Sequence, residues 1–357
     1  MNNKSMKAVR LHSFGDAGVL QYEDAPLPAV GPNDILLQLK GAGLNHLDIW
    51  VRSGARGRNI PLPHIPGSDG AGIVAEVGSE VKSVKPGDRV LLSPGLSCGT
   101  CNRCLSGRDN LCREYRVLGT KEDGTYAQFV KLPAVNVLPI PEGLDFEQAA
   151  AIPLVSLTAW HMLVTLARIQ PGETVLIHGA GSGVGSMGIQ IAKLVGAHVV
   201  TTAGSDEKLE KAKALGADDV INYKKNDFVD EVKRLTEKRG VDVVFEHIGG
   251  EVFEKSITIL AKGGRLVTCG ATSQYNCNVD VRYVYSRHQS IFGSWMGGKH
   301  ELVDVLKFFS PVVNGRKEPR LRLRPVLDRV FPLSEAAEAH RHIEARKNFG
   351  KVVLKIS

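Results

Sequence analysis

The sequence lacks any long apolar run and any apolar segment at its N-terminus. Hydrophobic residues make up 43% of the 357 residues, yet no uninterrupted stretch approaches the roughly 20 apolar residues that a membrane-spanning helix needs. The first ten residues, MNNKSMKAVR, are polar and contain no hydrophobic core of a secretion signal. We therefore expect a cytoplasmic protein that makes no use of a membrane.

The chain also lacks a basic segment of the kind that binds nucleic acid. Its net charge is +7 and its pI is about 9.0, but Lys and Arg are scattered among acidic residues, as in KLEKAKALGADD. No basic stretch is interleaved with aromatic residues, which make up only 6% of the chain. We do not expect nucleic-acid binding; a modest positive charge equally suits an anionic small ligand.

Cysteine is scarce, with six residues in all, but four of them fall in one short segment. Cytosolic proteins seldom keep disulfides, so such a cluster indicates a metal site or redox chemistry. The spacing Cys-x2-Cys-x2-Cys-x7-Cys offers four soft ligands and no open position, which is typical of structural zinc. A redox pair, an iron–sulfur cluster and metal-free thiols are the alternatives. The predicted ligands are Cys98, Cys101, Cys104 and Cys112.

The pattern of apolar segments changes once, near residue 147. Before it, short segments such as KAVRL and GIVAEVG are separated by Gly- and Pro-rich turns, as in a β-barrel. After it, EQAAAIPLVSLTAWHMLVTLA has helical periodicity, and strands then alternate with helices such as VFEKSITILAKG. This alternation indicates a doubly wound parallel sheet in an α/β fold. The tail ends in a strand, KVVLKIS, that we expect to return to the β-rich part.

A glycine-rich loop follows the strand ETVLIHG and precedes a helix and a second strand. Glycines there let backbone N–H groups approach a pyrophosphate at the helix N-terminus. The favoured register is Ala180-x-Ser182-x-x-Gly185, with small residues in place of the first two glycines. The sequence therefore predicts a dinucleotide site whose loop residues are Gly181, Ser182, Gly183 and Val184.

The end of the second strand of this unit bears on the choice of cofactor. NAD sites usually place an acidic residue there, whereas this chain reads Thr-Thr-Ala-Gly-Ser over 201–205. Lys208 follows, and Tyr223 ends the next predicted strand. Asp206 is the competing ribose ligand, but it lies in a first helical turn, where acids are favoured in any case. The pattern favours NADPH.

The whole chain resembles the medium-chain dehydrogenase/reductase superfamily. The motifs that support this resemblance are GLNHLDIWVRSG, PGSDGAGIVAEVG, VKPGDRV, the cysteine segment, AAAIPLVSLTAW and GKVVL. Among its branches it most resembles the quinone oxidoreductases, through the N-x-x-D-x-x-x-R-x-G stretch over 45–54. It departs from many of them because it keeps the cysteine lobe of the zinc alcohol dehydrogenases.

The resemblance implies two domains and further ligands for the cofactor. A chaperonin-10-like β-barrel domain would comprise residues 1–151 and 299–357, and a Rossmann-type domain residues 152–298. NADPH phosphate binding is implied for Gly204, Lys208 and Tyr223, which match the family pattern in identity and spacing, and Ser205 beside them is a further predicted cofactor residue. Thr158 is implied at the nicotinamide end of the cofactor, and Lys351, in the closing G-K-x-V-L strand, near the cofactor. The segment SIFGSWMG is the sheet edge that the family uses for pairing, so we expect a homodimer or homotetramer.

The resemblance also locates where a catalytic zinc would be bound in the alcohol dehydrogenases. Asn45 stands in place of a cysteine ligand, and Gly67-Ser68-Asp69 in place of G-H-E. An amide and a hydroxyl are poor zinc ligands. We expect His46 to point away from the site and His64 to be a surface histidine, so we predict no catalytic zinc.

These observations predict an NADPH-dependent reductase of quinones or activated C=C bonds, whose charge-delocalising acceptors need no Lewis acid. The alternatives are a zinc alcohol dehydrogenase with atypical ligands and a zeta-crystallin-like structural or nucleic-acid-binding protein. The predicted active-site residues are Asn45 as a hydrogen-bond donor, Asp48 as an orienting acid and Trp50 as an apolar wall.

Overall fold

The computed structural model describes residues 5–55, 60–309, 312–313, 316–317 and 322–357. Its chain divides into two compact units, one of residues 1–154, 298–320 and 324–357, the other of residues 155–297 and 321–323. We call them the β-rich unit and the α/β unit. No helix in the described segments has the length and apolar character needed to cross a membrane.

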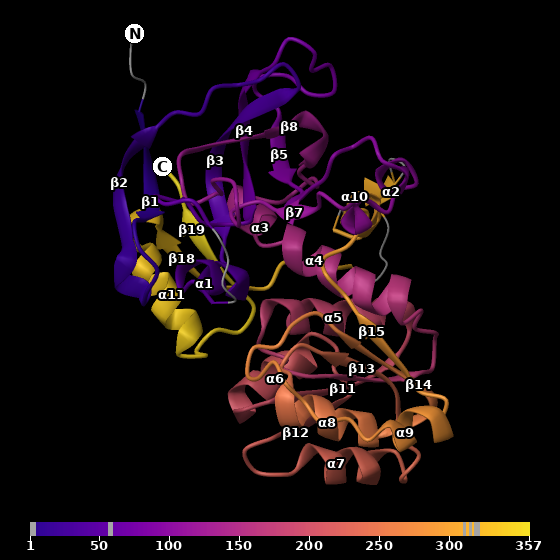
Figure 1. Cartoon of the computed structure of the whole chain (residues 1–357). Helices are drawn as coiled ribbons and strands as arrows, with labels where there is room; N and C mark the ends of the chain where they lie inside the picture. Colours follow the sequence, from indigo (N-terminus) through magenta and orange to yellow (C-terminus); the bar gives the residue numbers. More distant parts are fainter. Residues whose placement is uncertain (1–4, 56–59, 310–311, 314–315, 318–321) are drawn as a thin grey trace. The chain divides into compact units, whose positions relative to one another are not determined.

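The β-rich unit is built on a seven-stranded, mostly antiparallel sheet. Along the sheet the order is β18-β19-β3-β4-β5-β9, and β8 also pairs with β3. The C-terminal strand β19 pairs antiparallel with β3, so yellow and indigo ribbons lie side by side in Figure 1. The strands are β3 (Asp34–Gly43), β4 (Asp69–Val77), β5 (Arg89–Leu92), β8 (Phe129–Pro133), β9 (Val137–Pro139), β18 (Leu327–Pro332) and β19 (Lys351–Lys355).

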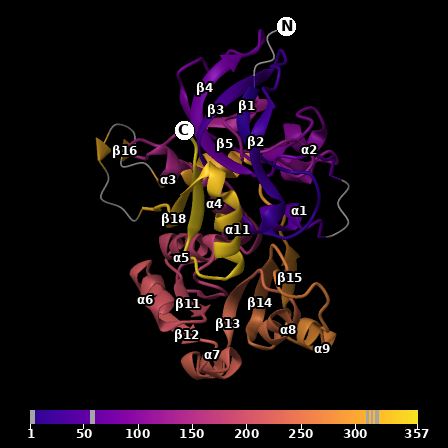
Figure 2. The ribbon, with the colours of Figure 1, turned by 90° about the vertical axis from the view of Figure 1, so that its left-hand side faces the viewer.

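Smaller elements complete this unit, and α11 packs beside β18 and β19 (Figure 2). The interior is apolar, with Leu37, Leu39, Val90 and Leu354 among its fully buried members. The strands are β1 (Ser5–Leu11), β2 (Leu20–Pro26), β6 (Gly95–Leu96), β7 (Arg116–Val117), β16 (Val312–Val313) and β17 (Arg316–Lys317). The helices are α1 (His46–Arg52), α2 (Asn102–Leu105), α3 (Phe146–Ala150), α10 (Lys299–Leu306) and α11 (Ala336–Glu344), with 3-10 turns at η1 (Ala17–Val19), η2 (Asp109–Leu111), η3 (Ala134–Asn136) and η5 (Leu333–Glu335).

The α/β unit is a parallel six-stranded sheet in the order β12-β11-β10-β13-β14-β15. The strand order reverses between β10 and β13: β11 and β12 are added on one side of β10, and β13, β14 and β15 on the other. Strand β15 therefore lies at one edge of the sheet. The strands are β10 (Thr174–Ile177), β11 (His198–Ala203), β12 (Asp219–Asn222), β13 (Val241–Glu246), β14 (Leu260–Thr268) and β15 (Ser290–Gly293). The helices are α5 (Gly183–Val195), α6 (Asp206–Ala214), α7 (Phe228–Leu235), α8 (Gly250–Thr258) and α9 (Val281–Ser286). The α/β class and the parallel sheet predicted from the sequence are confirmed.

The segment with helical periodicity after residue 146 is helical but divided, into α3, α4 (Pro153–Trp160) and a π-helical turn, η4 (His161–Leu166). Pro153 has no N–H to continue a preceding helix, but it suits the first position of a new one. Farther on, α8 ends at Thr258, and the predicted helical residues ILAKG instead belong mainly to β14, since Leu260 pairs with Val241.

Candidate active site

Asn45 lies where β3 gives way to α1. Its extended backbone (φ −128°, ψ 155°) makes it the N-cap of the helix, and the Asp48 carboxylate Oδ2 accepts a hydrogen bond from the Asn45 N–H at 2.9 Å. An acid at the third helical position that binds the N-cap amide is half of a capping box. Asp48 therefore orients the backbone of Asn45, while its predicted place in the active site stays a prediction.

The Asn45 side chain enters a buried cluster with Asp69 and Lys351. The Lys351 Nζ donates to Asn45 Oδ1 at 2.7 Å, to Asp69 Oδ2 at 2.9 Å and to the Leu44 carbonyl at 2.6 Å. An ammonium has three N–H donors, so all of them are used. Asp69 is fully buried and Lys351 is 4% exposed. We call Asn45, Asp69 and Lys351 the ammonium cluster.

The backbone of three strands brings this cluster together. Gly43 at the end of β3 pairs with Asp69 at the start of β4 and with Val353 of β19. A Cβ on Gly43 would lie 2.4 Å from the Ala150 carbonyl oxygen and 3.1 Å from Asp69 Cβ, so the strands meet this closely only at a glycine. The other oxygen of Asp69, Oδ1, accepts from the Leu154 N–H at 2.8 Å. Both carboxylate oxygens are thus engaged, which a buried ion pair requires.

Asp48 belongs to a second buried network that the sequence did not predict. The Arg52 Nη1 lies 3.2 Å from His340 Nδ1. On the other side of the ring, His340 Nε2 lies 3.1 Å from the Tyr126 hydroxyl. The Tyr126 hydroxyl in turn donates to Asp48 Oδ2 at 3.1 Å. A guanidinium only donates, so Nδ1 accepts and Nε2 carries the proton. Burial lowers the pKa of His340 to about 3, which keeps its ring neutral. The hydrogen bonds of this network therefore all run in one direction, from Arg52 through His340 and Tyr126 to the Asp48 carboxyl group.

Burial dominates the electrostatics of this network. It raises the pKa of Asp48 to about 7, although the Asn45 N–H, Lys351 and the Tyr126 hydroxyl all favour the anion. The other carboxylate oxygen of Asp48, Oδ1, is buried and has no hydrogen-bond partner among the described residues. Arg52, on the outer side, pairs with the half-exposed Glu344. Asp48 and Arg52 lie four residues apart on α1, so a local pattern relates them. Tyr126 and His340 are distant in sequence, and no local pattern predicted their contact with Asp48.

Trp50 lies on α1, five residues after Asn45. Its half-buried ring packs edge-to-face on the exposed His46 ring, with centroids 4.9 Å apart. The predicted role of Trp50 as an apolar wall stays a prediction.

The residues at the position of a catalytic zinc bond to the protein itself. The Ser68 hydroxyl is fully buried and donates to the Leu118 carbonyl at 2.8 Å. The expectation that His64 is a surface histidine is wrong: its ring is 2% exposed, and Nε2 bonds the Gly119 carbonyl at 3.0 Å. Residues 117–120 fold against the 64–68 segment, and that contact between distant segments buries the ring.

The four predicted cysteines do converge. Their ligand atoms all lie within 4.8 Å of one another, and in the described ranges they form the only group of three or more His, Cys, Asp or Glu close enough to hold a metal ion. The S···S separations are 3.8 Å for Cys98–Cys104, 3.6 Å for Cys101–Cys104 and 3.5 Å for Cys98–Cys112. A tetrahedral site with zinc–sulfur bonds of 2.3 Å has edges of about 3.8 Å.

Hydrogen bonds from the Thr100 and Cys101 N–H groups lower the pKa of Cys98 to about 6, which favours the thiolate ligand. The geometry fits a four-thiolate metal site.

The glycine-rich loop lies at the point in the α/β unit where the strand order reverses, between β10 and β13. Ser182 is the N-cap of α5, and its Oγ accepts from the Gly185 N–H at 2.9 Å. A Cβ on Gly185 would lie 2.3 Å from the Gly179 carbonyl oxygen, so only glycine lets the helix pack on the loop. The first-turn N–H groups, including those of Gly183 and Val184, point out of the helix start. Gly181 lies in the same loop. This arrangement fits a nucleotide pyrophosphate.

The tip of β11 brings together the residues predicted for a 2′-phosphate. Ser205 caps α6, with its Oγ 3.4 Å from the Lys208 N–H. Tyr223 is half exposed, and its hydroxyl lies 2.6 Å from where a Cβ on Gly204 would stand. The tyrosine ring therefore packs directly on the backbone of Gly204, an approach that any side chain at this position would prevent.

Asp206, the competing ribose ligand, is engaged elsewhere. Its Oδ1 accepts from Asn222 Nδ2 at 2.7 Å and its Oδ2 from Lys225 Nζ at 2.6 Å. The hydrogen bond from Lys225 lowers the pKa of Asp206.

Thr158 lies on α4 in the α/β unit, where it is buried; its Oγ1 lies 3.9 Å from the sulfur of Met296. Lys351, the residue implied near the cofactor, lies in the β-rich unit as part of the ammonium cluster.

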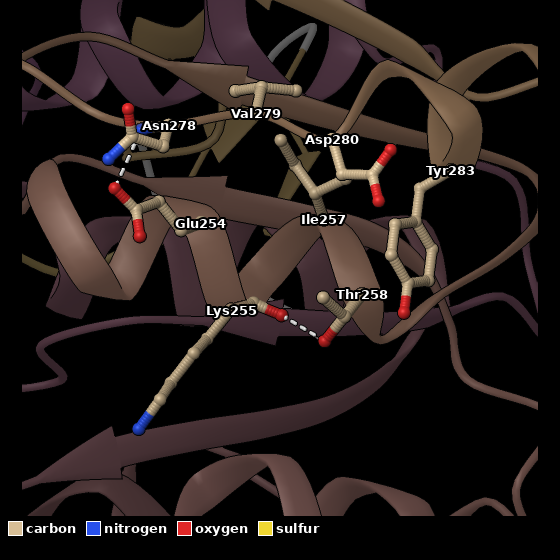
Figure 3. Close-up of a pocket in the computed structure, with 8 residues that line it drawn as sticks. All are labelled: Glu254, Lys255, Ile257, Thr258, Asn278, Val279, Asp280 and Tyr283. Atoms are coloured by element: carbon tan, nitrogen blue, oxygen red, sulfur yellow. Dashed lines mark hydrogen bonds between the residues drawn. The ribbon is translucent and has the colours of Figure 1, made fainter.

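A separate concavity lies along α8 and the start of α9 (Figure 3). Its polar groups bond to the protein: Glu254 Oε1 accepts from the Asn278 N–H at 2.7 Å, and Lys255 pairs with Asp227 and Glu251. It includes none of the predicted site residues.

Two family models cover most of the chain. The alcohol dehydrogenase GroES-like domain matches residues 31–142, and the zinc-binding dehydrogenase family matches residues 183–311. The quinone oxidoreductase of Rattus norvegicus is 31% identical over 353 residues, which are 98% of each chain. The chain belongs to the medium-chain dehydrogenase/reductase superfamily.

Other members of the superfamily are alcohol dehydrogenases. An NAD-dependent alcohol dehydrogenase of Sulfolobus acidocaldarius is 32% identical and covers 99% of this chain and 100% of its own length. A crystal structure of an NAD-dependent alcohol dehydrogenase has a TM-score of 0.92 and 48% identity over 99% of this chain and 100% of that one. The superfamily makes this protein an oxidoreductase with a nicotinamide cofactor, while its members differ in cofactor and substrate.

Proposed function

We propose that this protein is an NADPH-dependent reductase of quinones or α,β-unsaturated carbonyl compounds that works without a catalytic metal. The observation that carries the proposal is the ammonium cluster. At the position where zinc alcohol dehydrogenases bind their metal, Asn45 and Asp69 are already bonded to Lys351. The cation at this site is therefore part of the chain.

The donor set explains the choice of substrate class. When bound, NADPH supplies a hydride, and a conjugated acceptor spreads the resulting negative charge over several atoms. A simple ketone concentrates that charge on one oxygen, which a Lewis acid stabilises well. With an ammonium whose three N–H groups are all engaged, the chain offers hydrogen bonds alone. Such a site can therefore stabilise the product of hydride transfer to a conjugated acceptor.

Asn45 is the proposed donor to the acceptor oxygen. One N–H of its amide bonds Asp69 Oδ2 at 3.0 Å, and the amide has only a long contact of 3.5 Å with the Gly43 carbonyl for the other. Lys351 and Asp69 fix the amide plane from both ends, so the second N–H is oriented before substrate binds. Asp48 holds the backbone of the same residue. Trp50 would supply an apolar surface beside α1.

The α/β unit would bind the cofactor. The loop residues Gly181, Ser182, Gly183 and Val184 would hold the pyrophosphate, and Thr158 the nicotinamide end. Gly204, Ser205, Lys208 and Tyr223 would hold the 2′-phosphate. The engagement of Asp206 by Asn222 and Lys225 supports NADPH over NADH, because the carboxylate is not presented to a ribose.

The cysteine cluster would bind one structural zinc per chain. Its four thiolates leave no open position, so zinc there would stabilise the lobe and take no part in the reaction. The free edge of the six-stranded sheet at β15 supports pairing of two chains, and hence a homodimer or homotetramer. We place the protein in the cytoplasm.

The test is a panel of acceptors with each reduced cofactor, together with the reverse reaction of simple alcohols with NAD. We expect NADPH oxidation by a naphthoquinone or an unsaturated aldehyde, and little alcohol oxidation. Replacing Asn45 with Ala should lower kcat by about 100-fold, as for loss of one oxyanion donor. The exposed Asn33 is the matched control, and Asn33→Ala should leave kcat unchanged. Efficient NAD-dependent oxidation of simple alcohols would refute the proposal in favour of an alcohol dehydrogenase.

A further inference from the structure

Lys224 is a cation at the tip of β11 that neither the predicted phosphate residues nor the family pattern includes. It lies in the turn after β12, directly after Tyr223, and its N–H donates to Asn222 Oδ1 at 3.1 Å. A Cβ placed on Gly204 would lie 3.3 Å from Lys224 Cε and 2.6 Å from the Tyr223 hydroxyl. The Lys224 side chain therefore lies, like the tyrosine hydroxyl, directly over the backbone of Gly204.

The charges around this turn leave Lys224 available for a ligand. Asp206, at the start of α6, is bound by Lys225 and Asn222. Lys225 is thus neutralised by an ion pair, as are Lys211 and Lys213 on α6 by Glu207 and Glu210. Lys224 is exposed, and its ammonium has no ion pair or hydrogen bond within the described part of the chain. An unneutralised cation and a hydroxyl donor side by side over a glycine suit a dianionic phosphate.

We infer that Lys224 is a specificity-determining residue that binds the 2′-phosphate of the cofactor, together with Tyr223 and Lys208. The inference rests on the proposed use of NADPH. NADH has no group at this position, so Lys224 distinguishes the two cofactors and does little for the nicotinamide or the pyrophosphate. Removing its charge should weaken ligands that carry a 2′-phosphate and leave the others unchanged.

The experiment measures dissociation constants of the full chain by calorimetry for NADPH, NADH, 2′,5′-ADP and 5′-AMP. The variants are Lys224→Gln, the conservative Lys224→Arg and the matched control Lys213→Gln, which removes an equally exposed lysine paired with Glu210 on α6. Circular dichroism of each variant checks the fold. Loss of one charge-assisted contact at an exposed site should weaken NADPH and 2′,5′-ADP by about tenfold.

The expected result is a loss in Lys224→Gln that is restricted to the two 2′-phosphate ligands, largely restored in Lys224→Arg and absent in Lys213→Gln. If the wild type prefers 2′,5′-ADP to 5′-AMP and Lys224→Gln keeps that preference in full, the role of Lys224 is wrong while the NADPH proposal stands. If the wild type itself shows no preference, the proposed cofactor is wrong and the role of Lys224 falls with it.

Discussion

The β-rich unit contains two polar clusters of opposite kinds, the four cysteines and the ammonium cluster. The cysteines present four soft donors whose described contacts are only with one another and with nearby hydroxyl and N–H groups. The ammonium cluster presents an amide and a carboxylate, and a lysine of the same chain fills it. The ammonium cluster thus includes a cation that bonds directly to its donors.

The difference is one of charge: crowded thiolates favour a bound metal ion, whereas the carboxylate of Asp69 is already paired with a lysine of the chain. A buried carboxylate without a counter-charge is costly, so it either binds a cation or is given one by the protein. Lys351 provides that charge at a place that only the packing of β19 beside β3 and β4 makes available. Thiolates crowded together gain the same stabilisation from zinc.

The largest effect should follow loss of a cysteine ligand. In Cys104→Ser we expect bound zinc to fall from one per chain to none, because three thiolates and a hydroxyl bind it far more weakly. Four-thiolate sites contribute about 10 kcal/mol of binding free energy, so the lobe should lose protection in hydrogen exchange. Elemental analysis gives the metal count. Cys277→Ser, at an exposed cysteine outside the cluster, is the control; zinc retained by Cys104→Ser would contradict the assignment.

Removing the internal cation should have the next largest effect. Lys351→Met leaves Asp69 buried and unpaired, which should lower the free energy of unfolding by about 3–5 kcal/mol. Lys355→Met on the same strand removes the pair between the exposed Lys355 and Glu147 and should cost less than about 1 kcal/mol. Denaturant titrations compare the two variants. Equal losses would mean that the ammonium cluster is no more than a surface ion pair.

The stability of the protein should depend on pH through Asp48. Burial raises the folded-state pKa of Asp48 to about 7, so the folded chain holds this proton at pH values where the unfolded chain has lost it. The stabilisation is complete below the unfolded pKa and is lost as pH rises through about 7. At about 1.4 kcal/mol per pKa unit, it should decline by on the order of 3 kcal/mol between pH 5 and pH 8.

Asp48→Asn should flatten this dependence, because an amide does not titrate. Urea titrations at several pH values measure it, and Asp24→Asn, at an exposed acid paired with Lys7, serves as control. A variant whose stability still declines as steeply as that of the wild type would locate the titrating group elsewhere.

The smallest effect should come from Ser68. Ser68→Ala removes its hydrogen bond to the Leu118 carbonyl and should cost about 1 kcal/mol without changing the metal count. Thermal unfolding and elemental analysis measure both quantities. A fall in bound metal would make Ser68 part of a second metal site and would remove the contrast between the two clusters.

Local patterns predicted what depends on neighbours in sequence. The loop between β10 and α5 and its cap Ser182 follow from a strand, small residues and a helix in succession. The cysteine spacing predicted a cluster because all four residues lie on one short segment. The exceptions are local as well: the break before Pro153 and the strand beginning at Leu260 were hidden within apolar runs that suit helix or strand equally.

Contacts between distant segments could not be predicted in this way. The burial of His64 depends on the 117–120 segment, and the environment of Asp48 depends on Tyr126 and His340, which are 78 residues or more away. No periodicity or motif relates such positions, since they meet only when strands and helices pack.

The sequence by itself determined the α/β fold, the nucleotide loop, the cysteine cluster and the absence of zinc ligands at Asn45 and Ser68. These follow from residue type and short-range spacing, which set local backbone geometry and ligand chemistry. Only the tertiary structure decided what stands in place of a catalytic metal. Lys351 is 306 residues from Asn45, and its ammonium reaches that amide because β19 pairs with β3 and closes the sheet around a charge that water cannot solvate.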